Sequence, residues 1–193
     1  MAQYVSLAGS VSSGLWAALL FARGRQDALR YVEVDMAGAA RSFWAMAVGL
    51  PAIVCLRLMV WAQHGLPQQA GHTFSLDIAG YVLGWLLFAL LTFHLTNWFG
   101  RGQYWPRFIT AWNWCNVIEN LLLVFGGIPA LFGAPPLIDE AAQIFAIGWA
   151  LWIEWFATKH TLSTTGLTAA GLVILDQMIG FTLAALNTAL LQN

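Results

Sequence analysis

Four polar side chains interrupt one of the most apolar stretches of the sequence, ITAWNWCNVIENLLLV at residues 109–124. They are Asn113, Asn116, Glu119 and Asn120. Amides and carboxyls in such a stretch can hydrogen-bond to neighbouring helices, or they can line a path for a proton, an ion or a polar solute. At about 100° per residue on a helix, the three asparagines lie within about 60° of one another, and Glu119 lies about 60° from Asn116. The stretch therefore predicts a helix with one polar face.

Two further apolar stretches repeat this pattern. The helix predicted around residues 109–124 carries apolar residues opposite its polar face, and we expect them to face lipid: Ala111, Trp114, Ile118, Leu122 and Phe125. One further stretch places these polar residues on a single side: Glu140, Gln143, Glu154 and Thr158. The other has Asp176, Gly180 and Asn187 on a shared face, with Gln177 beside it. We expect the three polar faces to meet inside a bundle, because polar groups in hydrocarbon turn toward protein or a cavity.

Three ionisable residues are predicted to lie deep in the membrane. Counted at about 1.5 Å per residue from the ends that we place in the cytoplasm, Arg57 lies about 22 Å deep, Glu119 about 17 Å and Asp176 about 14 Å. An unpaired charge there costs at least about 2.5 kcal/mol, so we expect Arg57 to pair with Glu119 or Asp176. The predicted intramembrane polar cluster comprises Arg57, Asn113, Asn116, Glu119, Asn120, Asp176 and Gln177. These residues either join the helices through hydrogen bonds or line a path for a proton, an ion or a polar solute.

A second polar group is predicted near the cytoplasmic edge of the membrane. Its members are His94, Asn97, Glu154 and His160, with Arg107 nearby. His94, Glu154 and His160 are of types that bind metals, but they lack the compact spacing of a metal site. We therefore predict no metal and no cofactor.

The composition indicates an integral membrane protein. Of the 193 residues, 60% are hydrophobic and 9% are charged, whereas soluble domains have about 25% charged residues. A helix needs about 20 apolar residues to cross a bilayer, and five stretches provide them: residues 42–63, 77–99, 108–132, 139–158 and 167–190. We predict an all-α bundle of five transmembrane helices in residues 42–193, preceded by a cytoplasmic or interfacial segment, residues 1–41.

The basic residues predict how the bundle is oriented. Lys and Arg are retained on the cytoplasmic side of membranes, and all but Arg57 fall beside the same ends of the predicted helices: Arg23, Arg25, Arg30, Arg41, Arg101, Arg107 and Lys159. The opposite loops at 64–76 and 133–138, and the tail at 191–193, contain no Lys or Arg. We predict a cytoplasmic amino terminus and an outer carboxyl terminus, in an energised membrane such as the bacterial inner membrane. Tryptophans fit an aromatic belt at the two edges: Trp44, Trp98, Trp105, Trp155 and Trp61.

An amphipathic helix is predicted ahead of the first transmembrane helix. A stripe of apolar residues recurs there at helical spacing: Tyr4, Leu7, Val11, Leu15 and Leu19. Because Ser6, Ser10, Ser13 and Gly14 lie off this stripe, we expect the helix to lie in the cytoplasmic interface. The alternative, a sixth transmembrane helix over residues 4–22, is disfavoured by these serines and glycines. The first 22 residues contain no Lys or Arg, so we expect no cleaved signal peptide.

A close helix contact is predicted at Gly80 and Gly84, which form a GxxxG pattern in the second predicted transmembrane helix. Small residues at this spacing let two helix backbones approach each other. We expect the contact to lie inside the bundle, and a homodimer face is the alternative.

Two segments resemble the Yip1-like family of small membrane proteins. They are RSFWAMAVGLPA at residues 41–52 and AWNWCNVIENLLLV at residues 111–124, and the plan of five helices with a short outer tail extends the resemblance to about residues 14–190. The resemblance implies a membrane protein with no catalytic residues to carry over. Eukaryotic members act in membrane trafficking and bind small GTPases, but their DLYGP-type motif is missing from this sequence.

Motifs of soluble enzymes, such as GxSxG, HExxH and the glycine-rich phosphate loop, are absent from the sequence. We predict a non-enzymatic membrane protein that serves as a scaffold or accessory subunit, with the lipid bilayer and a membrane complex or second copy as partners, and no nucleic acid. The alternative is a small transporter or channel with a polar path lined by Arg57, Glu119 and Asp176. A scaffold would have paired, dry polar faces, whereas a transporter would have a water-accessible cavity that reaches these carboxylates.

Overall fold

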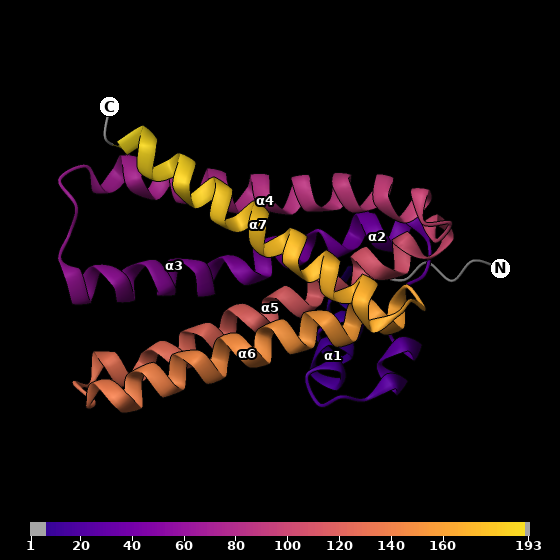
Figure 1. Cartoon of the computed structure of the whole chain (residues 1–193), viewed down its shortest axis with the longest axis horizontal. Helices are drawn as coiled ribbons and strands as arrows, with labels where there is room; N and C mark the ends of the chain where they lie inside the picture. The colour runs from indigo at the N-terminus through magenta and orange to yellow at the C-terminus, as the bar shows by residue number, and fades with distance from the viewer. Residues whose placement is uncertain (1–6, 192–193) are drawn as a thin grey trace.

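The computed structural model describes residues 7–191, which fold into α-helices joined by short turns, with no strand in that range (Figure 1). The helices are α1 (Leu7–Phe21), α2 (Met36–Ser42), α3 (Trp44–His64), α4 (Ala70–Trp98), α5 (Trp105–Leu131), α6 (Pro136–Thr161) and α7 (Gly166–Leu191). Two 3₁₀ turns, η1 (Gln26–Arg30) and η2 (Gly102–Tyr104), complete the chain. The predicted all-α bundle is confirmed. The predicted positions of Tyr4, Ser6 and residues 192–193 lie outside the described residues.

Glycine and proline set the two turns at the end of the bundle far from α1. Gly65 follows α3 with φ 87°, and Gly133 follows α5 with φ 66°. Side chains with a Cβ rarely adopt such a φ, so glycine ends both helices at low cost. Pro136 occupies the first turn of α6, where its missing N–H would have no helical partner. These residues keep both connections short, and the second turn places α5 and α6 side by side.

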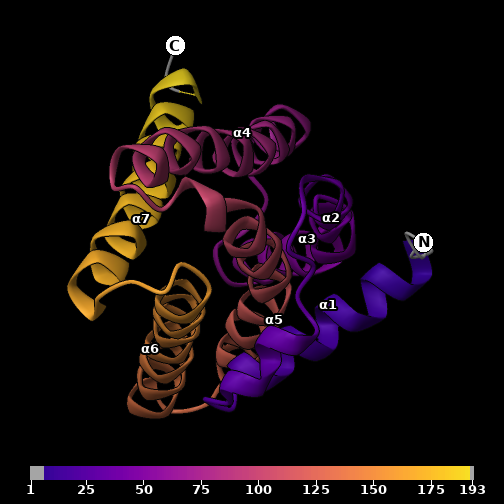
Figure 2. The same ribbon diagram turned by 90° about the vertical axis from the view of Figure 1, so that its right-hand side faces the viewer.

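Four stretches are long and apolar enough to cross a membrane: Met36–His64, Ala70–Trp98, Gly102–Leu131 and Gly166–Leu191. They match four of the five predicted transmembrane helices. The fifth, α6, has 26 residues but is less apolar, because polar and indole groups interrupt it: Gln143, Trp149, Trp152, Glu154 and Trp155. It lies against α5 along the bundle (Figures 1 and 2).

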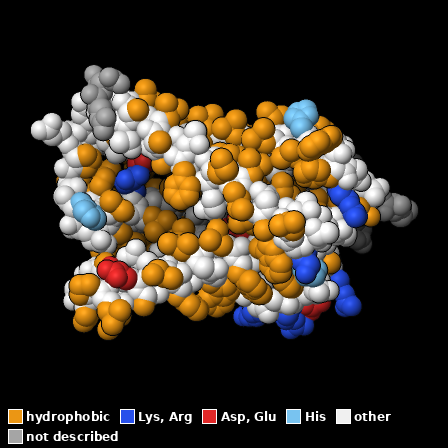
Figure 3. Space-filling model, viewed as in Figure 1, with side chains coloured by type: hydrophobic (Ala, Val, Ile, Leu, Met, Phe, Trp, Pro, Cys, Tyr) orange, Lys and Arg blue, Asp and Glu red, His pale blue; other side chains and the backbone are white. Residues whose placement is uncertain are grey.

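Helix α1 lies across one end of the bundle. When the bundle is viewed along its length, α5 and α6 are seen nearly end on while α1 extends across the picture (Figure 2). With 15 residues, α1 is shorter than the roughly 20 residues that cross a bilayer. Lys and Arg side chains gather at this same end of the face in Figure 3. This arrangement agrees with an interfacial helix rather than with a sixth transmembrane helix.

The predicted lipid-facing side of α5 is only partly correct. Phe125 is exposed, as predicted, but Ala111 and Trp114 are each only 2% exposed. Helix α1 covers Trp114, because Gly14 lets the Trp114 ring lie directly against the helix backbone and leaves no room for a Cβ. The helical period identified the apolar side of α5, but it could not show that protein rather than lipid covers the half near α1.

The described part of the predicted amino-terminal segment, residues 1–41, packs into the core. Ala17, Ala18 and Phe21 of α1 belong to the same hydrophobic cluster as the aromatic residues of α5. A polar network also joins α1 to α2 within this segment. The Ser10 hydroxyl donates to Glu33 Oε1 at 2.5 Å, and Arg41 Nη2 lies 2.6 Å from Glu33 Oε2.

Candidate functional site

A cavity of about 560 Å³ lies between α3, α4, α5 and α7. Its wall is largely apolar, but polar side chains enter it from all four helices: Arg57, Thr73, Asp77, Tyr81, Asn116, Asp176, Gln177, Asn187 and Thr188. Figure 3 shows the surface hollowed between the helices on this side. The cavity has the size of ordinary small-molecule sites, which occupy about 300–1,000 Å³. Among the predicted polar residues, Arg57, Asn116, Asp176 and Gln177 line it.

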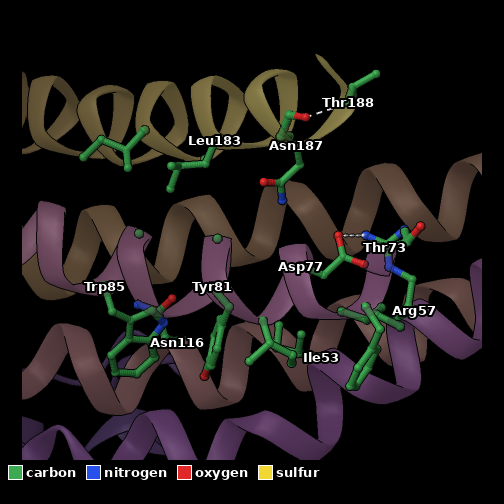
Figure 4. A pocket seen from close by; sticks show the side chains of 18 of the residues that line it. Ile53, Arg57, Thr73, Asp77, Tyr81, Trp85, Asn116, Leu183, Asn187 and Thr188 are labelled. Carbon is green, nitrogen blue, oxygen red and sulfur yellow. Dashed lines mark hydrogen bonds and ion pairs between the residues drawn. The ribbon is translucent and has the colours of Figure 1, made fainter. Parts of the chain in front are cut away.

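An ion pair occupies one end of the cavity. Arg57 Nη2 on α3 lies 2.5 Å from Asp77 Oδ1 on α4, and Asn116 and Trp85 lie at the opposite end (Figure 4). The predicted pairing of Arg57 with Glu119 or Asp176 is therefore wrong. Asp77 was missed because it was placed at the edge of a transmembrane helix that begins at residue 77, whereas α4 begins at Ala70. The two partners thus lie at equal distances from the loop between their helices, about 10 Å along each axis.

The glycines of the GxxxG pattern face α7 across the cavity. A Cβ on Gly80 would lie 3.1 Å from Asn187 Nδ2, and one on Gly84 would lie 3.6 Å from Leu183 Cδ1. Asn187 Nδ2 also donates to the Leu76 carbonyl at 3.0 Å. The close contact therefore lies inside the bundle, as expected, rather than on a homodimer face.

Three carboxylates lie near one another at the junction of α5, α6 and α7. Asp176 lines the cavity, and both Glu119 and Glu154 lie within electrostatic range of it. Glu119 Oε1 is buried and has no hydrogen-bond partner within residues 7–191. Glu154 is 2% exposed and accepts a hydrogen bond from Trp112 Nε1 at 3.3 Å. Since Trp112 also lines the cavity, it connects the wall to the carboxylates behind it.

Two of the predicted asparagines have structural roles away from the cavity. Asn113 is fully buried, and its Nδ2 donates to Ser42 Oγ at 2.7 Å, which joins α5 to α2. Asn120 is buried beside the Gly49 backbone of α3. The polar face of α5 is thus divided, because Asn113 bonds to α2 and Asn120 is buried beside α3, while Asn116 lines the cavity.

The predicted group at the cytoplasmic edge does not assemble. Asn97 Nδ2 donates to the Phe93 carbonyl of its own helix at 2.7 Å, and the His160 ring packs on Phe156 at 4.4 Å between centroids. Arg107 donates to the Thr161 carbonyl rather than to Glu154. Within residues 7–191 no group of three or more His, Cys, Asp or Glu side chains is placed to hold a metal ion. The alternative of a metal site at His94, Glu154 and His160 is therefore not found in this part of the chain.

Comparison of this chain with known proteins found no match. No family model, no curated protein and no solved structure matches it. The resemblance to the Yip1-like family therefore stays a prediction.

Proposed function

We propose that this multi-pass membrane protein admits a small polar solute to the cavity between α3, α4, α5 and α7, as a small transporter or channel does. The observation that carries the proposal is a cavity of about 560 Å³ within a bundle of apolar helices, lined by an ion pair and by the carboxylate of Asp176. Polar groups within membrane helices are costly and commonly mark the paths of ions and solutes. A transporter is expected to have a cavity that reaches its intramembrane carboxylates, whereas a scaffold is expected to have paired, dry polar faces. The cavity therefore supports the transporter better than the scaffold.

The proposal includes a fifth crossing of the membrane by α6. Its 26 residues reach across a bilayer, and it lies along α5, so its buried polar residues face protein. With five crossings, α1 and the end of α7 lie on opposite sides, in keeping with their places at opposite ends of the bundle in Figure 1. Basic residues near α1 favour a cytoplasmic amino terminus in an energised bacterial inner membrane.

A scaffold or accessory subunit without enzymatic activity is the second candidate. The observation that favours it is a mainly apolar groove of about 750 Å³ between α4 and α7, lined by residues that include Leu95, Phe99, Leu172 and Leu175. A groove of this kind suits a transmembrane helix of a partner protein, because close packing drives such association. A Yip1-like role would belong to this candidate.

Cysteine accessibility tests the proposal directly. In a background with Cys55→Ala and Cys115→Ala, Leu183→Cys places a thiol in the cavity wall, and Phe181→Cys places one on the outside of α7, where Phe181 is 74% exposed. Cationic and anionic methanethiosulfonate reagents react with thiols in water and not with thiols in lipid. We expect reaction at Leu183→Cys with at least one reagent, and none at Phe181→Cys in membranes. If Leu183→Cys resists both reagents, the cavity is closed to water and the proposal fails.

A further inference from the structure

The charges around the cavity are unbalanced. Arg57 is the cavity's cationic side chain, and its guanidinium is bonded to Asp77. Asp176 therefore faces the cavity without an ion-pair partner among residues 7–191, and Glu119 and Glu154 lie behind it within electrostatic range. In their ionised forms, three carboxylates near one another in a poorly solvated place repel each other and any anion that enters. A cation beside Asp176 would relieve this repulsion.

Aromatic rings form part of the cavity wall, at the end where Figure 4 places Trp85 and Asn116. Tyr81, Trp85 and Trp112 all line it, and they follow one another with centroid separations of 5.7 Å and 5.3 Å. The Tyr81 hydroxyl donates to the Met46 carbonyl at 2.9 Å, so its hydrogen is already used. The faces of such rings attract cations, by about 2 kcal/mol or more where water is excluded.

The lining suits an organic cation better than a metal ion. Calcium needs about six to eight oxygen ligands, and magnesium needs octahedral coordination. Apart from its few polar groups the wall is apolar, and no group of three or more acidic, His or Cys side chains could hold a metal within residues 7–191. An organic cation carries its charge inside an apolar shell, so it needs one carboxylate and a set of rings rather than a cage of oxygens.

We infer that the cavity binds an organic cation, of the class of protonated amines and quaternary ammonium or phosphonium ions, with its charge at Asp176 and its apolar groups against Trp85 and Trp112. This inference rests on the proposed function and specifies its solute. Asn116 and Gln177 line the cavity as well and supply amides for any polar group on the same molecule.

Direct binding to the full-length protein in lipid nanodiscs tests this assignment. The probes are tetraphenylphosphonium and the smaller tetraethylammonium, with tetraphenylborate as an anion of the same shape as the first, and empty nanodiscs supply the partition background. We expect at least one of the cations to bind and the anion not to. Asp176→Asn keeps the side-chain shape and should weaken binding of that cation by about tenfold or more, which corresponds to about 1.4 kcal/mol.

Matched variants distinguish the effect of the charge at Asp176 on cation binding from the effect of removing a negative charge elsewhere in the protein. Asp139→Asn removes the same charge from an exposed site on α6 outside the cavity, where Asp139 accepts a hydrogen bond from Gln143, and should leave cation affinity unchanged. Trp85→Phe keeps a ring and should retain more affinity than Trp85→Leu. Equal loss of affinity in Asp139→Asn and Asp176→Asn would overturn the assignment of the charge to Asp176.

The cysteine experiment distinguishes failure of this inference from failure of the proposed function. If Leu183→Cys reacts but neither cation binds, or if tetraphenylborate binds as well as tetraphenylphosphonium, the cavity is open and its solute is not a cation. If Leu183→Cys does not react, the proposed function itself fails. We further expect Leu183→Cys to react faster with the cationic reagent than with the anionic one, relative to a free thiol in solution. Asp176→Asn should reduce that ratio.

Discussion

Arg57 on α3 and Asp77 on α4 form an ion pair, 2.5 Å between Nη2 and Oδ1, that joins the two helices at one end of the cavity (Figure 4). The pair is partly shielded, since the side chains of Arg57 and Asp77 are 32% and 15% exposed. The second carboxylate oxygen, Asp77 Oδ2, is buried without a partner within residues 7–191. The pair therefore bridges α3 and α4 and also presents an unsatisfied acceptor near the cavity.

Asp77→Asn is expected to destabilise the bundle. Breaking a fully buried pair costs about 3–5 kcal/mol, and the partial exposure of Arg57 reduces this to about 1–2 kcal/mol. The midpoint of thermal unfolding in detergent should fall. Exchange of the charges, in Arg57→Asp with Asp77→Arg, should recover part of the loss. A midpoint that is unchanged in Asp77→Asn would show that the pair contributes nothing to stability.

Gly14→Ala is expected to loosen α1 from the bundle. A Cβ at Gly14 would overlap the Trp114 ring, and overpacking of a tight contact costs about 1–3 kcal/mol. Gly148→Ala is the matched control, because a Cβ there meets nothing within 4 Å and replacing a helical glycine gains about 1 kcal/mol. Thermal unfolding should therefore move in opposite directions in the two variants. A similar shift in both would contradict the tight contact between α1 and α5.

The main features of the fold follow from hydropathy and helical period. Long apolar stretches must be helices in a membrane, because lipid offers no partners to backbone N–H and C=O groups. The face shared by Asp176, Gly180 and Asn187, with Gln177 beside it, was predicted from the same period, and all four residues line the cavity. The helical period is therefore enough to predict which residues of α7 share a face.

The parts that the sequence did not predict depend on which helices are neighbours. Asp77 lies on α4, whereas Glu119 and Asp176, which were expected to pair with Arg57, lie on α5 and α7. Asp77 can pair with Arg57 because α4 starts at Ala70 and so places Asp77 two turns inside the helix. No role was predicted for Trp85 and Trp112, and only the assembled bundle places them on one cavity wall. Likewise, Gly14 and Trp114 meet because α1 crosses α5, and the sequence contains no local signal for that crossing.

Ser42→Ala is expected to weaken the contact between α2 and α5. Asn113 is fully buried and donates to Ser42 Oγ at 2.7 Å, and its Oδ1 already lacks a partner within residues 7–191. Loss of the hydroxyl would leave Asn113 with an unsatisfied donor as well, at a cost of about 1–3 kcal/mol. Ser12→Ala, which removes an exposed hydroxyl bonded to the Gly9 carbonyl, is the control and should change the unfolding midpoint little. Equal midpoints for the two variants would mean that the buried bond carries no stability.

Gly180→Phe is expected to close the cavity without unfolding the protein. Gly180 lines the cavity, and a Cβ at this position meets nothing within 4 Å, so an aromatic side chain can extend into the empty space. The change also removes a glycine from a helix, which favours the helix by up to about 1 kcal/mol. Reaction of Leu183→Cys with both thiol reagents should then fall to the level of Phe181→Cys.

Gly148→Phe provides the comparison for this variant. It makes the same substitution on α6, at a glycine that also has open space beside it but does not line the cavity, so Leu183→Cys should react as in the parent background. If Gly180→Phe leaves the reaction rate at Leu183→Cys unchanged, the reagents reach that thiol by a route other than the cavity. In that case reaction at Leu183→Cys would no longer support a solute site between α3, α4, α5 and α7. Because binding of organic cations needs the same space, Gly180→Phe should also abolish it, whereas Gly148→Phe should preserve it.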